Sequence, residues 1–89
     1  MGARYARRTD TSAKALIAYA ESIGFTYCPL NGTIDGLLAL GTRIIAVDWK
    51  SKGGTLTPLQ AKLIARGFPI RFLSTPAQVA AVRDEMRQA

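Results

Sequence analysis

The chain has 89 residues, and its 48% hydrophobic and 20% charged content is that of a single globular domain. Twelve Lys and Arg residues against six Asp and Glu residues give a net charge of +6. This balance favours an anionic partner such as nucleic acid, although a soluble protein can also simply be basic. One Cys and no His exclude an internal disulfide, a Cys-rich zinc site and a His-based catalytic triad. Any catalysis must therefore use carboxylates, lysine, tyrosine or a metal held by oxygen atoms.

Neither a membrane segment nor a secretory signal is expected. No apolar run approaches the roughly 20 residues that a membrane helix needs, and no apolar region follows the basic first residues. We therefore expect no membrane partner and a cytoplasmic location. Residues 1–9, MGARYARRT, contain Arg4, Arg7 and Arg8 and no acid. They predict a basic arm ahead of one domain at residues 10–89.

The first predicted elements are a helix and a short strand. Apolar residues at helical spacing predict a helix over residues 12–22, which Gly24 ends. A strand is expected over residues 25–30, because the following Asn31-Gly32 pair is a strong turn signal.

Two further strands, at residues 33–40 and 43–50, are rich in Leu, Ile and Val on both faces, which is typical of a sheet covered on both sides. Thr-Pro pairs then begin helices at residues 57–65 and 74–87, with a strand at residues 70–73 between them. The predicted order is α-β-β-β-α-β-α, which is an α/β fold.

Two aspartates interrupt the apolar strands. A two-residue type II′ hairpin at Gly41-Thr42 would place Asp35 directly opposite Asp48, with Cβ atoms about 4.5–5.5 Å apart. Lys50 follows Asp48 by two residues and so points to the same face.

Such a carboxylate pair is costly unless one member is protonated or a cation lies between the two. Hard cations such as Mg²⁺ prefer carboxylate oxygens, so Asp35, Asp48 and Lys50 form a candidate metal site. The alternative is a longer loop, which would break this pairing and leave both acids at strand edges facing water.

These residues resemble a known signature. Asp35 followed by Asp48-Trp49-Lys50 resembles the PD-(D/E)XK nuclease pattern, and the element order is that of the superfamily's common core, a mixed central sheet flanked by helices. The KSKGG loop, the Thr-Pro-x-Gln helix start and the Gly-x-Pro strand entry point to one family within this superfamily. They are similar to the VRR-NUC family of virus-type replication-repair nucleases, often stand-alone phage proteins. The similarity covers residues 12–82.

The resemblance implies a metal-dependent mechanism. Asp35, Asp48 and the backbone carbonyl of Trp49 would bind Mg²⁺ or Mn²⁺, and Lys50 would orient or help deprotonate the attacking water. Related nucleases often supply another acid from the first helix, which makes Glu21 a further metal ligand, unless it is simply an exposed helix residue. Strand alternation points Trp49 away from Asp48, which favours core packing over base stacking.

Other residues would act around this centre. Gln60 would orient Lys50 or the water, or would form a capping box with Thr57. Glycine amides and lysine suit phosphate contact, and the candidate nucleic-acid-binding residues are Lys52, Gly53, Gly54, Arg4, Arg7 and Arg8.

Together these features predict a Mg²⁺- or Mn²⁺-dependent endonuclease that hydrolyses DNA. The small size favours recognition of DNA structure, as in branched DNA or Holliday junctions, and is compatible with a homodimer. A phage origin would place the protein in the cytoplasm of a bacterial host cell, in DNA repair. One alternative is a non-catalytic basic nucleic-acid-binding module with a degenerate nuclease fold, favoured by Asp48 where the family more often has Glu. Another is a small α/β interaction protein whose acid pair is structural.

Overall fold

The protein has an α/β fold built on one mixed sheet. This computed structural model describes residues 11–50 and 54–88. The elements, in chain order, are α1 (Thr11–Ser22), β2 (Thr26–Pro29), β3 (Gly36–Leu40), β4 (Arg43–Trp49), α2 (Pro58–Ala65), β5 (Ile70–Leu73) and α3 (Pro76–Gln88). The predicted order is therefore confirmed. The predicted basic arm at residues 1–9 lies outside the described residues.

The four strands lie in the order β2-β3-β4-β5. The first three form an antiparallel meander, and β5 pairs parallel to β4 after the chain has passed through α2. The sheet is therefore mixed, as expected, and β4 is the strand with neighbours of both kinds.

The hairpin between β3 and β4 has the predicted register. Gly41 has φ of 64°, and no other residue of this turn has a positive φ, which is the pattern of a two-residue turn with glycine first. Leu40 pairs with Arg43, and the ladder continues back to Gly36 opposite Val47. The last pair of the ladder lies one residue from each aspartate.

The start of β3 differs from the prediction. The strand begins at Gly36, whereas the sequence pattern suggested residue 33, and residues 31–34 form bends. The carbonyl of Thr33 accepts a hydrogen bond from the Gln60 side chain, 2.8 Å away. The backbone of this segment therefore bonds to α2 where the prediction had a sheet ladder.

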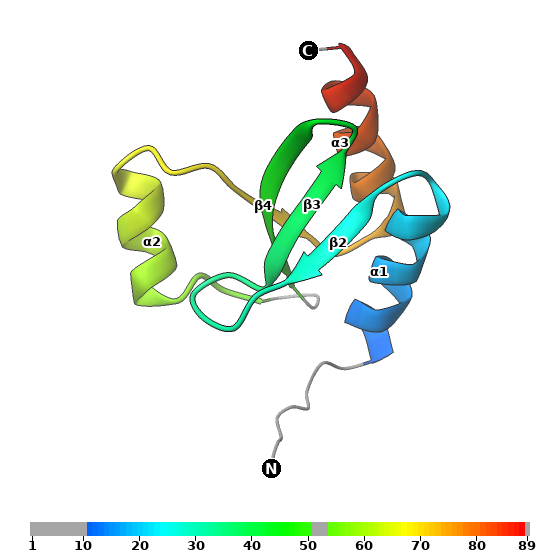
Figure 1. Cartoon of the computed structure of the whole chain (residues 1–89). Coiled ribbons are helices and arrows are strands. Elements are labelled where there is room, and N and C mark those ends of the chain that lie inside the picture. Colours follow the sequence, from blue (N-terminus) through cyan, green and yellow to red (C-terminus); the bar gives the residue numbers. More distant parts are fainter. Residues whose placement is uncertain (1–10, 51–53, 89) are drawn as a thin grey trace.

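One face of the sheet carries the hydrophobic core. Strand alternation points Leu38, Val47, Trp49 and Leu73 toward α1 and α3, which Figure 1 shows on one side of the sheet. The buried cluster consists of these four residues with Ala13, Leu16, Ala20, Phe25, Val79, Val82 and Met86. Burial of this apolar surface is the main stabilising contribution to the fold.

The other face is only partly covered. Figure 1 shows α2 on the side of the sheet away from α1 and α3. Ile44 of β4 is 63% exposed, so the expected cover on both faces is incomplete. Several large apolar residues in or beside α2 are also exposed, namely Leu56, Leu59, Ile64 and Phe68. Among the described residues, no helix has both the length and the apolar character needed to span a membrane.

Candidate functional site

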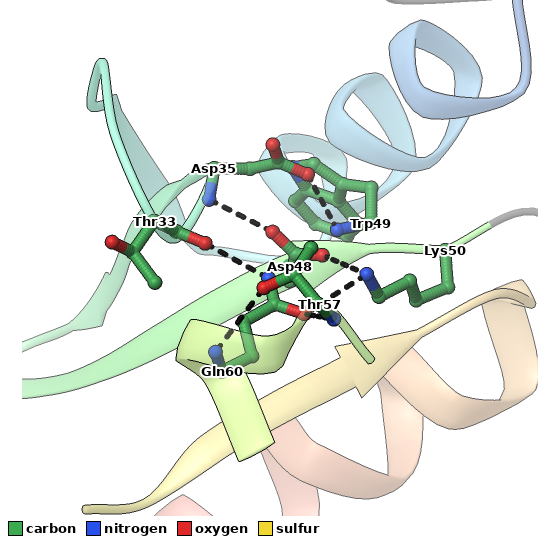
Figure 2. A network of polar contacts seen from close by, with 7 residues as sticks. All are labelled: Thr33, Asp35, Asp48, Trp49, Lys50, Thr57 and Gln60. Carbon is green, nitrogen blue, oxygen red and sulfur yellow. Dashed lines mark hydrogen bonds and ion pairs between the residues drawn. The ribbon is translucent and has the colours of Figure 1, made fainter. Parts of the chain in front are cut away.

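The carboxylates of Asp35 and Asp48 each accept a backbone hydrogen bond across the end of the β3–β4 ladder. The backbone N–H of Asp35 donates to Oδ1 of Asp48 at 3.1 Å. The backbone N–H of Trp49 donates to Oδ2 of Asp35 at 2.8 Å. Figure 2 shows both contacts. Each carboxylate therefore accepts a hydrogen bond from the backbone of the other segment, Asp48 from Asp35 and Asp35 from Trp49, and the two acids are held side by side.

Lys50 is the cation of this site. Its Nζ lies 2.9 Å from Oδ2 of Asp48 and 3.1 Å from Oε1 of Gln60. The ammonium also lies 5.5 Å from the centre of the Phe72 ring. Asp48 is only 6% exposed, and a buried carboxylate needs such a partner. Lys50 thus offsets part of the negative charge of the pair.

The surroundings of Asp35 raise the pKa of its carboxyl. Burial raises the pKa of the Asp35 carboxyl, and the charge of Asp48 raises it further. The Trp49 backbone N–H and the charge of Lys50 act in the opposite direction without cancelling the rise. A second cation beside the pair would favour the ionised form of Asp35.

Gln60 forms the capping box and also contacts Lys50. Its backbone N–H donates to Oγ1 of Thr57 at 3.1 Å, and its Oε1 accepts from the Thr57 backbone N–H at 3.2 Å, which is a capping box. The same Oε1 accepts from Lys50, and Nε2 donates to the Thr33 carbonyl. The side chain is 2% exposed and holds the start of α2 against the site.

Tyr27 supports the site, and sequence reasoning missed it. Its hydroxyl donates to the backbone carbonyl of Asp35 at 3.1 Å, and its ring meets that of Trp49 edge to face at 5.6 Å. A Cβ on Gly36 would come within 2.6 Å of the Tyr27 ring and 2.5 Å of the Cys28 carbonyl, so only glycine fits there. A glycine directly after Asp35 in a predicted strand was the available signal for this close approach.

Trp49 packs in the core as expected. It is buried among residues of the α1 and α3 side, and its indole Nε1 has no hydrogen-bond partner in the described part of the chain. Base stacking is therefore not its role. Its backbone carbonyl lies in the chain between the two site residues Asp48 and Lys50.

The structure does not bring Glu21 to the two aspartates. Glu21 is exposed in the last turn of α1, and the next residues lead to the hairpin end of the sheet, where Thr26 pairs with Ala39. Asp35 lies at the opposite end of β3. Gly54 is exposed, and the other candidate phosphate-binding residues, Lys52, Gly53, Arg4, Arg7 and Arg8, lie outside the described residues.

The donor set suits a hard cation in type. No N–H group of the described residues donates to Oδ1 of Asp35, and Oδ2 of Asp48 lies against Lys50. The described chain holds no cluster of three or more Asp, Glu, Cys or His side chains, so a metal would have two carboxylates. Mg²⁺ and Mn²⁺ can be bound by only one or two carboxylates, and they complete their coordination with backbone carbonyls and water.

Comparisons of the chain with protein-family models, with curated proteins and with solved structures found no match. The PD-(D/E)XK core and the VRR-NUC family therefore stay predictions from the motifs. What the structure adds is the close arrangement of Asp35, the Asp48–Lys50 segment and Gln60, which come from three separate parts of the sequence.

Proposed function

We propose that the protein is a metal-dependent endonuclease of the VRR-NUC type that hydrolyses DNA phosphodiester bonds, with branched DNA as its preferred substrate. The observation that supports this best is the adjacent pair of carboxylates, Asp48 bonded by the Asp35 N–H and Asp35 bonded by the Trp49 N–H, with Lys50 at 2.9 Å from Asp48. Two adjacent carboxylates beside a lysine suit phosphoryl transfer, in which positioning and charge stabilisation supply most of the catalysis.

The residues have distinct roles in this proposal. Asp35 and Asp48, with the Trp49 carbonyl, would hold Mg²⁺ or Mn²⁺, which lowers the pKa of bound water and neutralises charge on the phosphate. Lys50 donates a hydrogen bond to a phosphate oxygen or to the attacking water. Gln60 keeps the ammonium of Lys50 in place through its Oε1, 3.1 Å away.

A second candidate function is a basic nucleic-acid-binding module without cleavage. The ion pair of Lys50 with Asp48 favours it, because the buried carboxylate is already paired without a metal. Both functions involve an anionic partner, in line with the net charge of +6. Only metal-dependent cleavage separates them.

The deciding experiment measures cleavage of labelled four-way junctions, flaps, single strands and linear duplex in EDTA, Mg²⁺ and Mn²⁺. Asp48→Asn and Lys50→Ala should each reduce cleavage by about 10³-fold or more, because both remove charge at the reacting phosphate. Asp84→Asn, an exposed acid on α3, is the matched control and should leave cleavage unchanged. Salt-sensitive binding with no cleavage by the wild type would establish the binding module in place of the nuclease.

A further inference from the structure

Helix α2 presents two opposite faces. Gln60 points inward to Lys50 and Thr33. Leu59 and Lys62 of α2 and its C-cap residue Arg66 follow one another at i, i+3 and i+7, which places them along one stripe, about 100–160° around the helix from Gln60. All three are exposed, and Leu59 is 52% exposed. We call these three residues the outer stripe.

Among the described residues, the two cations of the outer stripe have no acidic partner. The ion pairs of the described residues join Lys50 to Asp48, Arg71 to Glu85 and Arg83 to Asp84. Lys62 and Arg66 make none within the described part of the chain.

The surrounding sequence cannot supply an acid either. Residues 49–83 contain no Asp or Glu, and their cations are Lys50, Lys52, Lys62, Arg66, Arg71 and Arg83. The exposed acids of the described chain lie on α1 and α3, on the other side of the sheet, apart from Asp35 at the site. Lys62 and Arg66 thus make no ion pair within the described residues, and their charge can meet an anion.

The spacing of the two cations fits a nucleic-acid backbone. Four residues of helix separate Lys62 from Arg66 by about 6 Å along the axis. A duplex strand carries one phosphate per roughly 3.4 Å of its axis, so the pair spans about two phosphate repeats of one strand. Exposed Leu59 beside them adds an apolar contact of the kind that sugars and unstacked bases accept.

We propose that the outer stripe binds the phosphate backbone of a second nucleic-acid arm, while a first arm lies at the candidate catalytic site on the inner side of α2. A helix with its side chains is about 10–12 Å across, so its two faces cannot contact the same phosphate. The inference rests on the proposed function and specifies its substrate: two arms that diverge around α2 are present in branched DNA and absent from linear duplex.

The test compares two double variants of equal charge. Lys62→Ala with Arg66→Ala removes the cations of the outer stripe. Lys14→Ala with Arg87→Ala removes two exposed cations from α1 and α3, on the other side of the sheet. Binding to a four-way junction and to a linear duplex of equal length is measured in EDTA over a range of salt concentrations. Thermal unfolding checks that both variants stay folded.

The stripe variant should bind the junction at least tenfold more weakly, with a salt slope smaller by about 1.8, which is the value for two lost phosphate contacts. Its duplex binding should change less than threefold, and the control variant should change less than threefold on both substrates. Equal losses for the two variants, or equal losses on junction and duplex, would overturn the second-arm site.

The proposed nuclease activity is scored separately in the same preparations. If the wild type does not cleave with Mg²⁺ or Mn²⁺ but the stripe variant still loses junction binding selectively, the stripe stands and the nuclease fails. If the wild type cleaves and the two variants lose binding equally, the nuclease stands and the stripe fails.

Discussion

Helices α2 and α3 begin with the same four-residue motif, Thr-Pro-x-Gln, yet the two glutamines have different surroundings. Gln78 of α3 is exposed, and its Oε1 accepts only from the backbone N–H groups of Ser74 and Thr75. Gln60 of α2 is buried and adds contacts with Lys50 and Thr33 to its capping bonds. The motif therefore determines a helix start, and the tertiary neighbours decide whether the same side chain also supports a site.

The same contrast holds between the two sides of the sheet. The α1 and α3 side is apolar and closely packed, whereas the α2 side carries the polar network and several exposed apolar residues. Strand β4 supplies both, because alternation sends Val47 and Trp49 to the core and Asp48 to the opposite face. Stability is concentrated on one side, and the candidate chemistry lies on the side that contributes less to it.

The largest expected effect tests this division by truncating one leucine on each side. Leu38 is fully buried in the core, so Leu38→Ala should lower the free energy of unfolding by about 2–5 kcal/mol. Leu59→Ala, on the exposed face of α2, should cost less than about 0.5 kcal/mol. Urea unfolding measures both. Similar losses for the two variants would mean that the α2 side is as important for stability as the core.

The second prediction tests the difference between the two glutamines at the helix starts. Gln60→Ala leaves Lys50, the Thr57 N–H and the Thr33 carbonyl without their partner, which should cost about 1–3 kcal/mol. Gln78→Ala removes only two exposed capping bonds and should cost about 0.5–1 kcal/mol. Chemical denaturation gives the difference, and amide hydrogen exchange of α2 should increase only in the Gln60 variant. If Gln60→Ala lowers the free energy of unfolding no more than Gln78→Ala does, Gln60 acts only as a helix cap.

How far the sequence predicts this molecule depends on how local each signal is. The Gly41-Thr42 turn fixes the register of β3 and β4 from neighbouring residues, so the proximity of Asp35 and Asp48 could be derived. The capping motifs located both later helices. All these signals act within a turn or a single hairpin.

Contacts between distant segments were not predictable in the same way. The Thr33 carbonyl bonds to Gln60, and β3 begins only at Gly36. No pattern in the neighbouring sequence predicts this hydrogen bond. The position of Tyr27 over Gly36 follows from the pairing of β2, an edge strand whose register the sequence left open. The placement of Glu21 at the far end of the sheet depends on how α1 packs, which one helix pattern does not determine.

A third prediction concerns the competition between Lys50 and a metal for Oδ2 of Asp48, 2.9 Å from Nζ. Lys50→Met keeps the length of the side chain and removes its charge, so Mn²⁺ affinity should rise about tenfold, which corresponds to roughly 1.4 kcal/mol. Calorimetric titration without DNA measures this, with Lys62→Met on the outer stripe as a control that should not change it. Unchanged or weaker Mn²⁺ binding by the Lys50 variant would contradict the competition.

The smallest expected effect concerns the pKa values of two carboxyls that are perturbed in opposite directions. The pKa of Asp35 is raised in the folded protein, chiefly by burial, so the folded state loses stability as the pH rises through that pKa. Asp35→Asn removes the charge but keeps an acceptor for the Trp49 N–H. In EDTA at pH 7 it should raise stability by a few tenths up to about 1 kcal/mol, because solvent screens the exposed carboxyl. Below about pH 4 the Asp35 carboxyl is protonated in both the folded and the unfolded state, so the gain in stability from Asp35→Asn should vanish.

Glu85 on α3 provides the control of opposite sign. A hydrogen bond from Arg71 lowers the pKa of Glu85, so its charge contributes stability above the unfolded pKa that is lost as the pH falls through the folded value. Glu85→Gln should therefore lower the melting temperature slightly at pH 7, where Asp35→Asn raises it. Melting curves of both variants at pH 7 and pH 3.5 give the two signs. A loss of stability in Asp35→Asn without metal would show that the acid pair is held by its own bonds and needs no further cation.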